Sequence, residues 1–149
     1  MSKNDTILEG KPRHKKVRVK SAKGRRRSST LWLQRHLNDP YVQNAKEKGL
    51  KSRAAWKLVQ IDEKFKILKM GKRVVDLGAA PGGWTQIAVS RTGSGNVLAV
   101  DVVDMDPIEG AVILKCDVTQ PHSVKLIQEK FDYPVNVVLS DMAAKTTGH

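Results

Sequence analysis

Residues 74–84 read Val-Val-Asp-Leu-Gly-Ala-Ala-Pro-Gly-Gly-Trp and place a β-branched run, a glycine-rich turn and a helix start within eleven residues. A short apolar run with branched side chains is typical of a strand in the middle of a parallel sheet. Gly78 and Gly82 let the backbone turn sharply and come close to a ligand, because they carry no β-carbon. Together these features predict a strand, a ligand-binding loop and a helix in an α/β domain.

A second carboxylate strengthens this prediction. Residues 97–101 form another buried-strand pattern, Val-Leu-Ala-Val-Asp, which ends in Asp101, 25 residues after Asp76. In a βαβ unit an acidic side chain at the end of the second strand reaches the ribose hydroxyls of a nucleotide that is bound over the glycine loop. If the Pro-Gly-Gly turn only linked a strand to a helix, the position of Asp101 would have no explanation.

The glycine loop lacks the motifs that bind phosphate groups. It contains no Gly-x-Gly-x-x-Gly, and no Gly-Lys-Ser/Thr follows Gly83, so it is neither a dinucleotide loop nor a P-loop. A cofactor with an adenosine end and no phosphate group fits better. The pattern therefore favours S-adenosylmethionine.

Strands and helices alternate along the chain. The expected elements are helices over 39–49 and 52–65, a strand over 73–77, a helix over 84–91, strands over 96–101 and 111–117, a helix over 121–131 and a strand over 135–141. This alternation predicts a Rossmann-like fold with a parallel sheet and helices on both faces. Because ligands of such sheets bind at the carboxyl ends of the strands, we expect Asp101, Asp117 and Asp141 to face one crevice.

The acidic residues suit different parts of the cofactor. We expect Asp101 to accept hydrogen bonds from both ribose hydroxyls and Asp117 to bind the exocyclic amine of adenine. Asp141 is expected where the methyl group and an incoming hydroxyl meet. Asp76 has two interpretations that the sequence leaves open: it approaches the ammonium group of the cofactor, or it is a structural acid that bonds amides of the loop. Gly78 is a further candidate for contact with the cofactor.

Two further residues of the loop complete the expected cofactor site. The backbone of Gly82 comes close to the cofactor because no β-carbon blocks it. Trp84 is expected to pack beside the cofactor where the helix begins.

The helix expected over residues 52–65 has an apolar face formed by side chains at i, i+4, i+7 and i+11, namely Ala54, Leu58, Ile61 and Phe65. Lys57 borders this face. Its ammonium group points into solvent or lies at the rim of the cofactor cleft, and spacing alone favours solvent.

Several motifs identify a known family. The loop motif at 76–84, together with Ser-Asp-Met-Ala at 140–143, Ser-Arg-Ala at 52–54 and Lys-Leu at 57–58, resembles the FtsJ-like (RlmE) methyltransferase family from residue 29 onward. The resemblance implies S-adenosylmethionine-dependent 2′-O-ribose methylation of a uridine in large-subunit (23S) ribosomal RNA. Transfer RNA is the alternative substrate of that reaction class, and a small-molecule or protein methyltransferase is a more distant alternative.

The resemblance also implies catalytic residues. Lys57 matches the first lysine of the catalytic Lys-Asp-Lys-Glu set of the family, and Asp141 matches its aspartate, so Lys57 is now expected at the cleft. A ribose 2′-hydroxyl is a poor nucleophile, and a base or cation beside it helps the transfer. The second lysine and the glutamate have no match in this sequence. Lys145 is no substitute, since it follows the fourth expected strand directly.

Members of this family have more strands than the four expected here. We therefore expect the chain to be the N-terminal portion of such an enzyme, which would be a monomer when complete. An inactive RNA-binding remnant is the alternative interpretation.

Positive charge is concentrated at the amino end. The formal net charge is +12, and residues 1–29 hold 11 of the 27 lysines and arginines but 2 of the 15 acidic residues. A segment this basic buries too little apolar surface to order itself. We expect residues 1–28 to be a disordered tail that contacts RNA phosphates, followed by the methyltransferase portion over 29–149. A tail that only keeps the protein soluble is the alternative.

The remaining residue types indicate where the protein resides. Cys116 is the single cysteine, so we expect no internal disulfide and a small buried side chain at this position. The four histidines lack the spacing of metal ligands, and no metal site is expected. No apolar stretch has the length of a membrane span or the form of a secretory signal, so we expect a cytoplasmic protein without a membrane partner.

Overall fold

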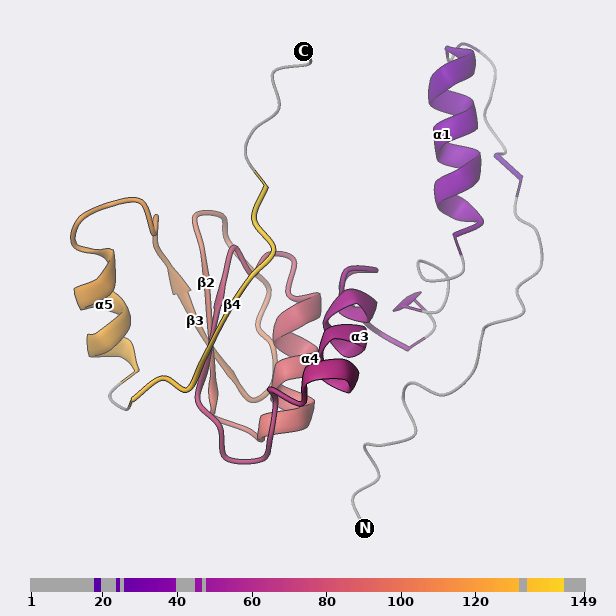
Figure 1. Ribbon diagram of the computed structural model, residues 1–149. Helices are drawn as coiled ribbons and strands as arrows, with labels where there is room; N and C mark the ends of the chain where they lie inside the picture. Colours follow the sequence, from indigo (N-terminus) through magenta and orange to yellow (C-terminus); the bar gives the residue numbers. More distant parts are fainter. Residues whose placement is uncertain are drawn as a thin grey trace.

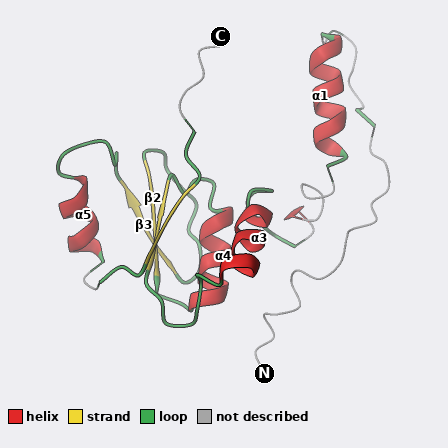
Figure 2. Cartoon of the chain, in the orientation of Figure 1, coloured by secondary structure: helices red, strands yellow, loops and turns green. Residues whose placement is uncertain are grey.

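The computed structural model describes residues 18–19, 24, 26–39, 45–46, 48–131 and 134–143. Within these ranges four parallel strands form one sheet, with helices on both of its faces (Figure 1 and Figure 2). In chain order the elements are α1 (Arg27–Leu37), α3 (Ala55–Phe65), β1 (Val74–Leu77), α4 (Gly83–Thr92), β2 (Val97–Asp101), β3 (Ala111–Lys115), α5 (Ser123–Lys130) and β4 (Val137–Ser140). The predicted α/β class is confirmed.

The order of the strands across the sheet is β3-β2-β1-β4, and every neighbouring pair is parallel. The chain runs outward from β1 through β2 to β3 and then returns to the other side of β1 with β4. The direction of winding therefore reverses between β1 and β4. In open α/β sheets this is the place, at the carboxyl ends of the strands, where ligands bind.

The central strands are apolar because both of their faces are covered. Residues 97–100 of β2 are fully buried between β1 and β3, and in β1 Val74 and Val75 are buried as well. A strand that is covered on both sides has no solvent face, which is why these runs do not alternate between apolar and polar residues.

Two apolar cores flank the sheet. One lies between the sheet and the helices α3 and α4, where Leu58 and Ile87 pack against Val74 and Val97. The other contains Cys116, and partly buried side chains of α5 pack against it. Figure 1 shows the same division, with α5 on one side of the strands and α3 with α4 on the other. Cys116 is free and buried, as predicted.

The rotation of α3 differs from the prediction. Leu58 is buried as expected, but the other fully buried residues of the helix are Ala55, Val59 and Asp62. Phe65, expected on the apolar face, has 63% of its surface exposed. The helix ends there, because Lys66 adopts a left-handed conformation with φ of 54°, and the last turn projects past the core.

Some predictions fall partly or wholly outside the described residues. Of the helix expected over 39–49, the structure describes residues 39, 45–46 and 48–49; residues 45–46 are helical and Gly49 has a positive φ of 68°. Most of the tail over 1–28 lies outside as well, although α1 begins at Arg27. Lys145 is also outside. Of the helices that are described, none has the length and apolar character to cross a membrane.

Candidate functional site

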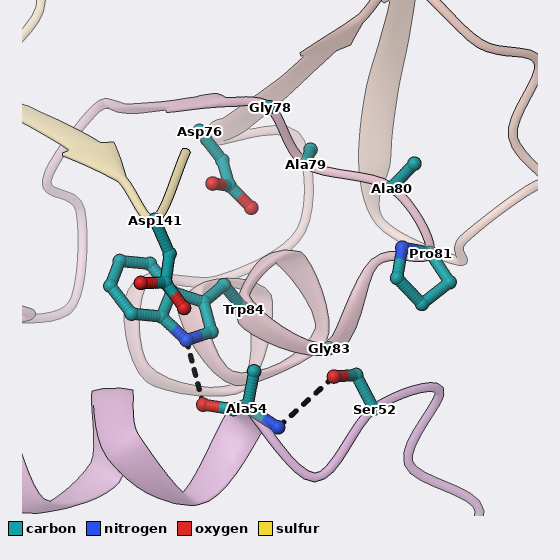
Figure 3. A pocket seen from close by; sticks show the side chains of 10 residues that line it. All are labelled: Ser52, Ala54, Asp76, Gly78, Ala79, Ala80, Pro81, Gly83, Trp84 and Asp141. Carbon is teal, nitrogen blue, oxygen red and sulfur yellow. Dashed lines mark hydrogen bonds between the residues drawn. The ribbon is translucent and has the colours of Figure 1, made fainter. Parts of the chain in front are cut away.

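A cavity of about 70 Å³ lies at the carboxyl end of β1, where the direction of winding reverses (Figure 3). It is formed by the glycine loop, the start of α4, the turn before α3 and the residue that follows β4. Its lining residues are Ser52, Ala54, Asp76, Gly78, Ala79, Ala80, Pro81, Gly83, Trp84 and Asp141. Of the residues predicted for the site, the structure brings Asp76, Gly78, Trp84 and Asp141 together here.

The glycines of the loop are required by their conformation and by close packing. Gly78 has φ of 70°, and a β-carbon there would collide with the side chain of Met142. Gly82 has φ of 114°, and a β-carbon there would collide with Ile108. Neither position accepts a larger residue without strain. Gly82 does not line the cavity. It is the residue that precedes α4, and its positive φ lets the loop turn into this helix.

Asp76 is almost fully buried, with 1% of its surface exposed. Its carboxylate accepts a hydrogen bond from Thr85 Oγ1 at 2.7 Å, so its partner is a side chain of α4. Burial raises the pKa of Asp76 to about 6, the Thr85 hydrogen bond opposes this rise, and the nearby charges of Asp101 and Asp141 add to it. Asp76 is thus an acid at the cavity wall whose ionised form is costly until a cation arrives.

Asp101 is the last residue of β2 and holds the glycine loop in place. Its Oδ2 accepts a hydrogen bond from the amide of Ala80 at 2.9 Å, and its Oδ1 accepts one from the amide of Val103 at 3.1 Å. Asp101 does not line the cavity. Because a carboxylate offers about four acceptor positions, these two bonds leave room for further donors.

Asp117 lies two residues beyond β3, outside the cavity lining. Its carboxylate accepts hydrogen bonds from the hydroxyl (2.7 Å) and amide (2.9 Å) of Thr119 and from Gln120 (3.4 Å). These bonds lower its pKa. Of the three strand-end carboxylates that were expected to face one crevice, Asp141 lines the cavity. Asp101 instead bonds the loop, and Asp117 bonds its own turn.

Lys57 and Asp141 form an ion pair at the rim of the cavity. Lys57 Nζ donates to Asp141 Oδ1 at 2.5 Å, although the two residues are 84 positions apart. The ammonium group also lies 5.8 Å from the centre of the Trp84 ring, within range of a cation–π interaction. The side chains are 59% and 37% exposed, so the pair is accessible to an incoming molecule.

Trp84 fixes the start of α3 against α4. Its Nε1 donates to the carbonyl of Ala54 at 2.7 Å, and the amide of Ala54 bonds Ser52 Oγ at 3.0 Å (Figure 3). A β-carbon on Gly83 would lie 2.8 Å from Ser52 Cβ, so this turn requires glycine at that position. These contacts set where Lys57 emerges, one turn later.

Sequence reasoning assigned no role to Ser52 or to Thr85 and Gln86 of α4. Gln86 joins α4 to the segment before α3, since it accepts the amide of Lys51 at 2.7 Å and donates to the carbonyl of Gly49 at 3.1 Å. Ser52 belongs to the Ser-Arg-Ala motif at 52–54, one of the motifs that carry the family resemblance. This motif was the only sequence feature that could have pointed to Ser52. The helical pattern contains no signal for the two polar residues of α4.

A basic groove adjoins the cavity. Two hollows of about 340 and 360 Å³ meet at Arg53. Their lining residues are Ala45, Lys46, Leu50, Lys51, Ser52, Arg53, Ala54, Trp56, Lys57, Gln60 and Pro81. Four of these are cations and none is acidic. Arg53 pairs with Asp39 at 2.7 Å and Lys51 with Asp106 at 3.5 Å, from outside the lining. Lys57 has a partner outside the lining too, Asp141. The lining itself carries positive charge only, which favours contact with an anion.

No group of three or more metal-binding side chains comes together among the residues that the structure describes.

Comparison with known proteins finds similarity to longer relatives. The sequence model described as FtsJ-like methyltransferase matches residues 50–149. A protein from Paramagnetospirillum magneticum is 53% identical over 146 residues, which cover 94% of this chain and 60% of that protein. One from Rhodospirillum rubrum is 55% identical over 138 residues, with 89% and 52% covered. Both are named ribosomal RNA large subunit methyltransferase E.

A solved structure shares the fold. The crystal structure of a ribosomal RNA methyltransferase from Plasmodium falciparum superimposes with a TM-score of 0.58 at 28% identity, over 66% of this chain and 59% of that chain. The chain thus spans between about half and three fifths of the length of these proteins.

Proposed function

Because the chain belongs to the FtsJ-like methyltransferase family, we propose that it carries the cofactor loop and the reacting pair of an S-adenosylmethionine-dependent 2′-O-ribose methyltransferase. Its proposed substrate is a uridine of large-subunit (23S) ribosomal RNA, in line with the names of the relatives. The observation that supports this best is the contact of 2.5 Å between Lys57 and Asp141 beside the cavity of the glycine loop.

The residues present fit S-adenosylmethionine. Asp76 and Asp141 offer carboxylates to its ammonium group and its sulfonium end, and Asp101 has acceptor positions left for the ribose hydroxyls. Asp117, two residues beyond β3, is proposed to bind the adenine amine. Gly78 and Gly82 keep the backbone of the loop free of β-carbons, and the bound cofactor supplies the methyl group.

Lys57 and Asp141 are proposed to prepare the ribose hydroxyl. An ammonium group has three N–H donors, and the bond to Asp141 uses one of them. A second can bond the 2′-oxygen and stabilise the negative charge that develops as its proton passes to water, which reaches this exposed pair. Asp141 holds the lysine in position, and the Trp84 ring, 5.8 Å from the ammonium group, adds a cation–π interaction. Holding the oxygen in line with the methyl group accounts for much of the rate enhancement in such reactions.

RNA is proposed to reach the site along the basic groove, assisted by the tail over residues 1–28. Phosphate contacts of this kind raise affinity without reading sequence.

Deleting residues 1–26, which keeps α1 intact, should weaken RNA binding and flatten its dependence on salt while the affinity for the cofactor stays the same. An unchanged salt slope would favour a tail that only keeps the protein soluble.

Methylation by a full-length chimera tests the proposed function. In this chimera the present chain replaces the segment that it matches in the 53% identical relative. Incubated with unmodified large ribosomal subunits and labelled cofactor, the chimera should place one 2′-O-methyl group on a uridine. Methylation of transfer RNA instead would identify the alternative substrate, and a chimera that binds cofactor but methylates neither RNA would support the inactive remnant.

A further inference from the structure

The connection between α3 and β1 is a second basic surface, remote from the cavity. Residues 63–73 contain five lysines and arginines and a single carboxylate, Glu63. Because β1 ends at the glycine loop, the segment that leads into β1 lies at the opposite end of the strands, where they begin (Figure 1). We name residues 64–72, which comprise the last two residues of α3 and the connection that follows it, the lysine loop.

The lysines of this loop are exposed and form no ion pair with any residue in the described part of the chain. They are Lys64, Lys66, Lys69 and Lys72. Other lysines of the domain do have carboxylate partners, as in the pair of Lys115 with Asp104. Four like charges on one short connection raise the local potential, which favours binding of a polyanion.

Buried hydrogen bonds hold the lysine loop in one conformation. Asp62 accepts the amide of Leu68 at 2.7 Å, and its carboxylate is held by Arg91 at 2.6 Å. Leu68 is buried with 6% of its surface exposed, and the amide of Gly71 bonds the carbonyl of Thr92 at 2.9 Å. A surface that is ordered in advance loses less conformational entropy when it binds.

Two large apolar side chains stand among these lysines in contact with water. Phe65 is 63% exposed and Met70 is 75% exposed. The ammonium group of Lys64 lies 5.3 Å from the Phe65 ring. Cations that bind phosphates, with an exposed aromatic ring on which a base can stack, form the combination that binds single-stranded nucleic acid.

We propose that the lysine loop is a second RNA-binding surface, which holds a single-stranded segment by its phosphates and stacks one base on Phe65. The proposal rests on the proposed function only for the choice of RNA as the polyanion. Two isolated apolar side chains are too few to insert into a membrane, so RNA is favoured over an anionic lipid surface.

Binding of a fluorescent 12-nucleotide oligouridine to the 149-residue chain tests this proposal, measured by anisotropy over a range of salt concentrations. The variant replaces Lys64, Lys69 and Lys72 with glutamine. A matched control replaces Lys115, Lys125 and Lys130, which lie on β3 and α5, and so loses the same charge. Loss of three phosphate contacts should reduce the slope of log K against log salt by about 2. The Kd should rise about tenfold or more at moderate salt, and the control should change it less than about twofold.

Phe65→Ala separates stacking from charge. It should weaken oligouridine binding by about fivefold or more, leave the salt slope unchanged and leave binding to duplex RNA unchanged.

Equal effects of the two triple variants, or no effect of Phe65→Ala, would overturn the proposal. Loss of binding to phosphatidylglycerol vesicles with unchanged RNA binding would assign the loop to membranes instead. A wild-type chain that binds no RNA would contradict the proposed function as well, whereas a triple variant with wild-type affinity contradicts only the role of the loop.

Discussion

Asp76 carries the main electrostatic cost of the cavity. Its carboxylate is buried close to the charges of Asp101 and Asp141, and its pKa is raised from 3.8 to about 6. For an acid, a folded-state pKa above the unfolded value means that its contribution to stability is complete below pH 3.8 and is lost as the pH rises through 6. The ionised Asp76 therefore lowers the free energy of unfolding at neutral pH, and it gives the cavity a negatively charged wall that suits a cationic ligand.

The Asp76→Asn variant should remove this dependence while keeping the hydrogen bond from Thr85. Between pH 4 and pH 7 the wild-type chain should lose about 2–3 kcal/mol of unfolding free energy relative to the variant. Urea unfolding of both proteins at the two pH values measures the difference. Parallel pH profiles would show that Asp76 has an ordinary pKa.

The assignment of Asp101 to the ribose predicts a loss of cofactor affinity in Asp101→Ala. Two charge-assisted hydrogen bonds are removed, each worth about 1.5–3 kcal/mol, so calorimetry should show S-adenosylmethionine affinity reduced by about 100-fold or more. Asp104→Ala is the control, because Asp104 is an exposed carboxylate close by. If both variants bound the cofactor as the wild type does, Asp101 would only anchor the loop.

At the residue level the sequence could identify the strand-end acids and the glycines, because strand and turn patterns are local. It could not identify the hydrogen bond between Thr85 and Asp76, or the packing of Ser52 against Gly83. These contacts depend on how α3 and α4 meet, and this is decided by tertiary packing.

Among the elements, α3 links the pair of Lys57 and Asp141 to the lysine loop. Its existence follows from its spacing of apolar residues, but its rotation does not, since Asp62 is buried and Phe65 is exposed. A buried carboxylate gives no apolar signal in the sequence. It is accommodated because Arg91 and the amide of Leu68 satisfy it.

Removing this carboxylate should therefore destabilise the domain strongly. Asp62→Ala leaves the Arg91 cation and the Leu68 amide without their partner, which should cost about 3–5 kcal/mol of unfolding free energy. Glu63→Ala, at the exposed neighbouring position, should change stability by less than about 0.5 kcal/mol. Chemical denaturation of the two variants compares these values, and a loss below about 1 kcal/mol for Asp62→Ala would show that the pair does not hold α3 in place.

Across the whole molecule the alternation of strands and helices was sufficient to predict the parallel sheet, since right-handed crossovers leave few topologies. The pairing of Lys57 with Asp141 needed more. Spacing alone favoured solvent for Lys57, and only the family resemblance placed it at the cleft. The physical reason is that β4 lies beside β1, so that the residue after β4 comes within reach of α3.

Lys57 is proposed to act on the reacting hydroxyl while it is paired with Asp141. Single-turnover methylation of large ribosomal subunits by the chimera and its Lys57→Ala variant tests it most directly, with cofactor affinity measured alongside and Lys125→Ala, on α5, as the control. Lys57→Ala should lower the transfer rate by about 100-fold or more while the cofactor Kd stays within about twofold. A transfer rate within about threefold of the parent chimera, or a loss that lies entirely in cofactor affinity, would contradict it.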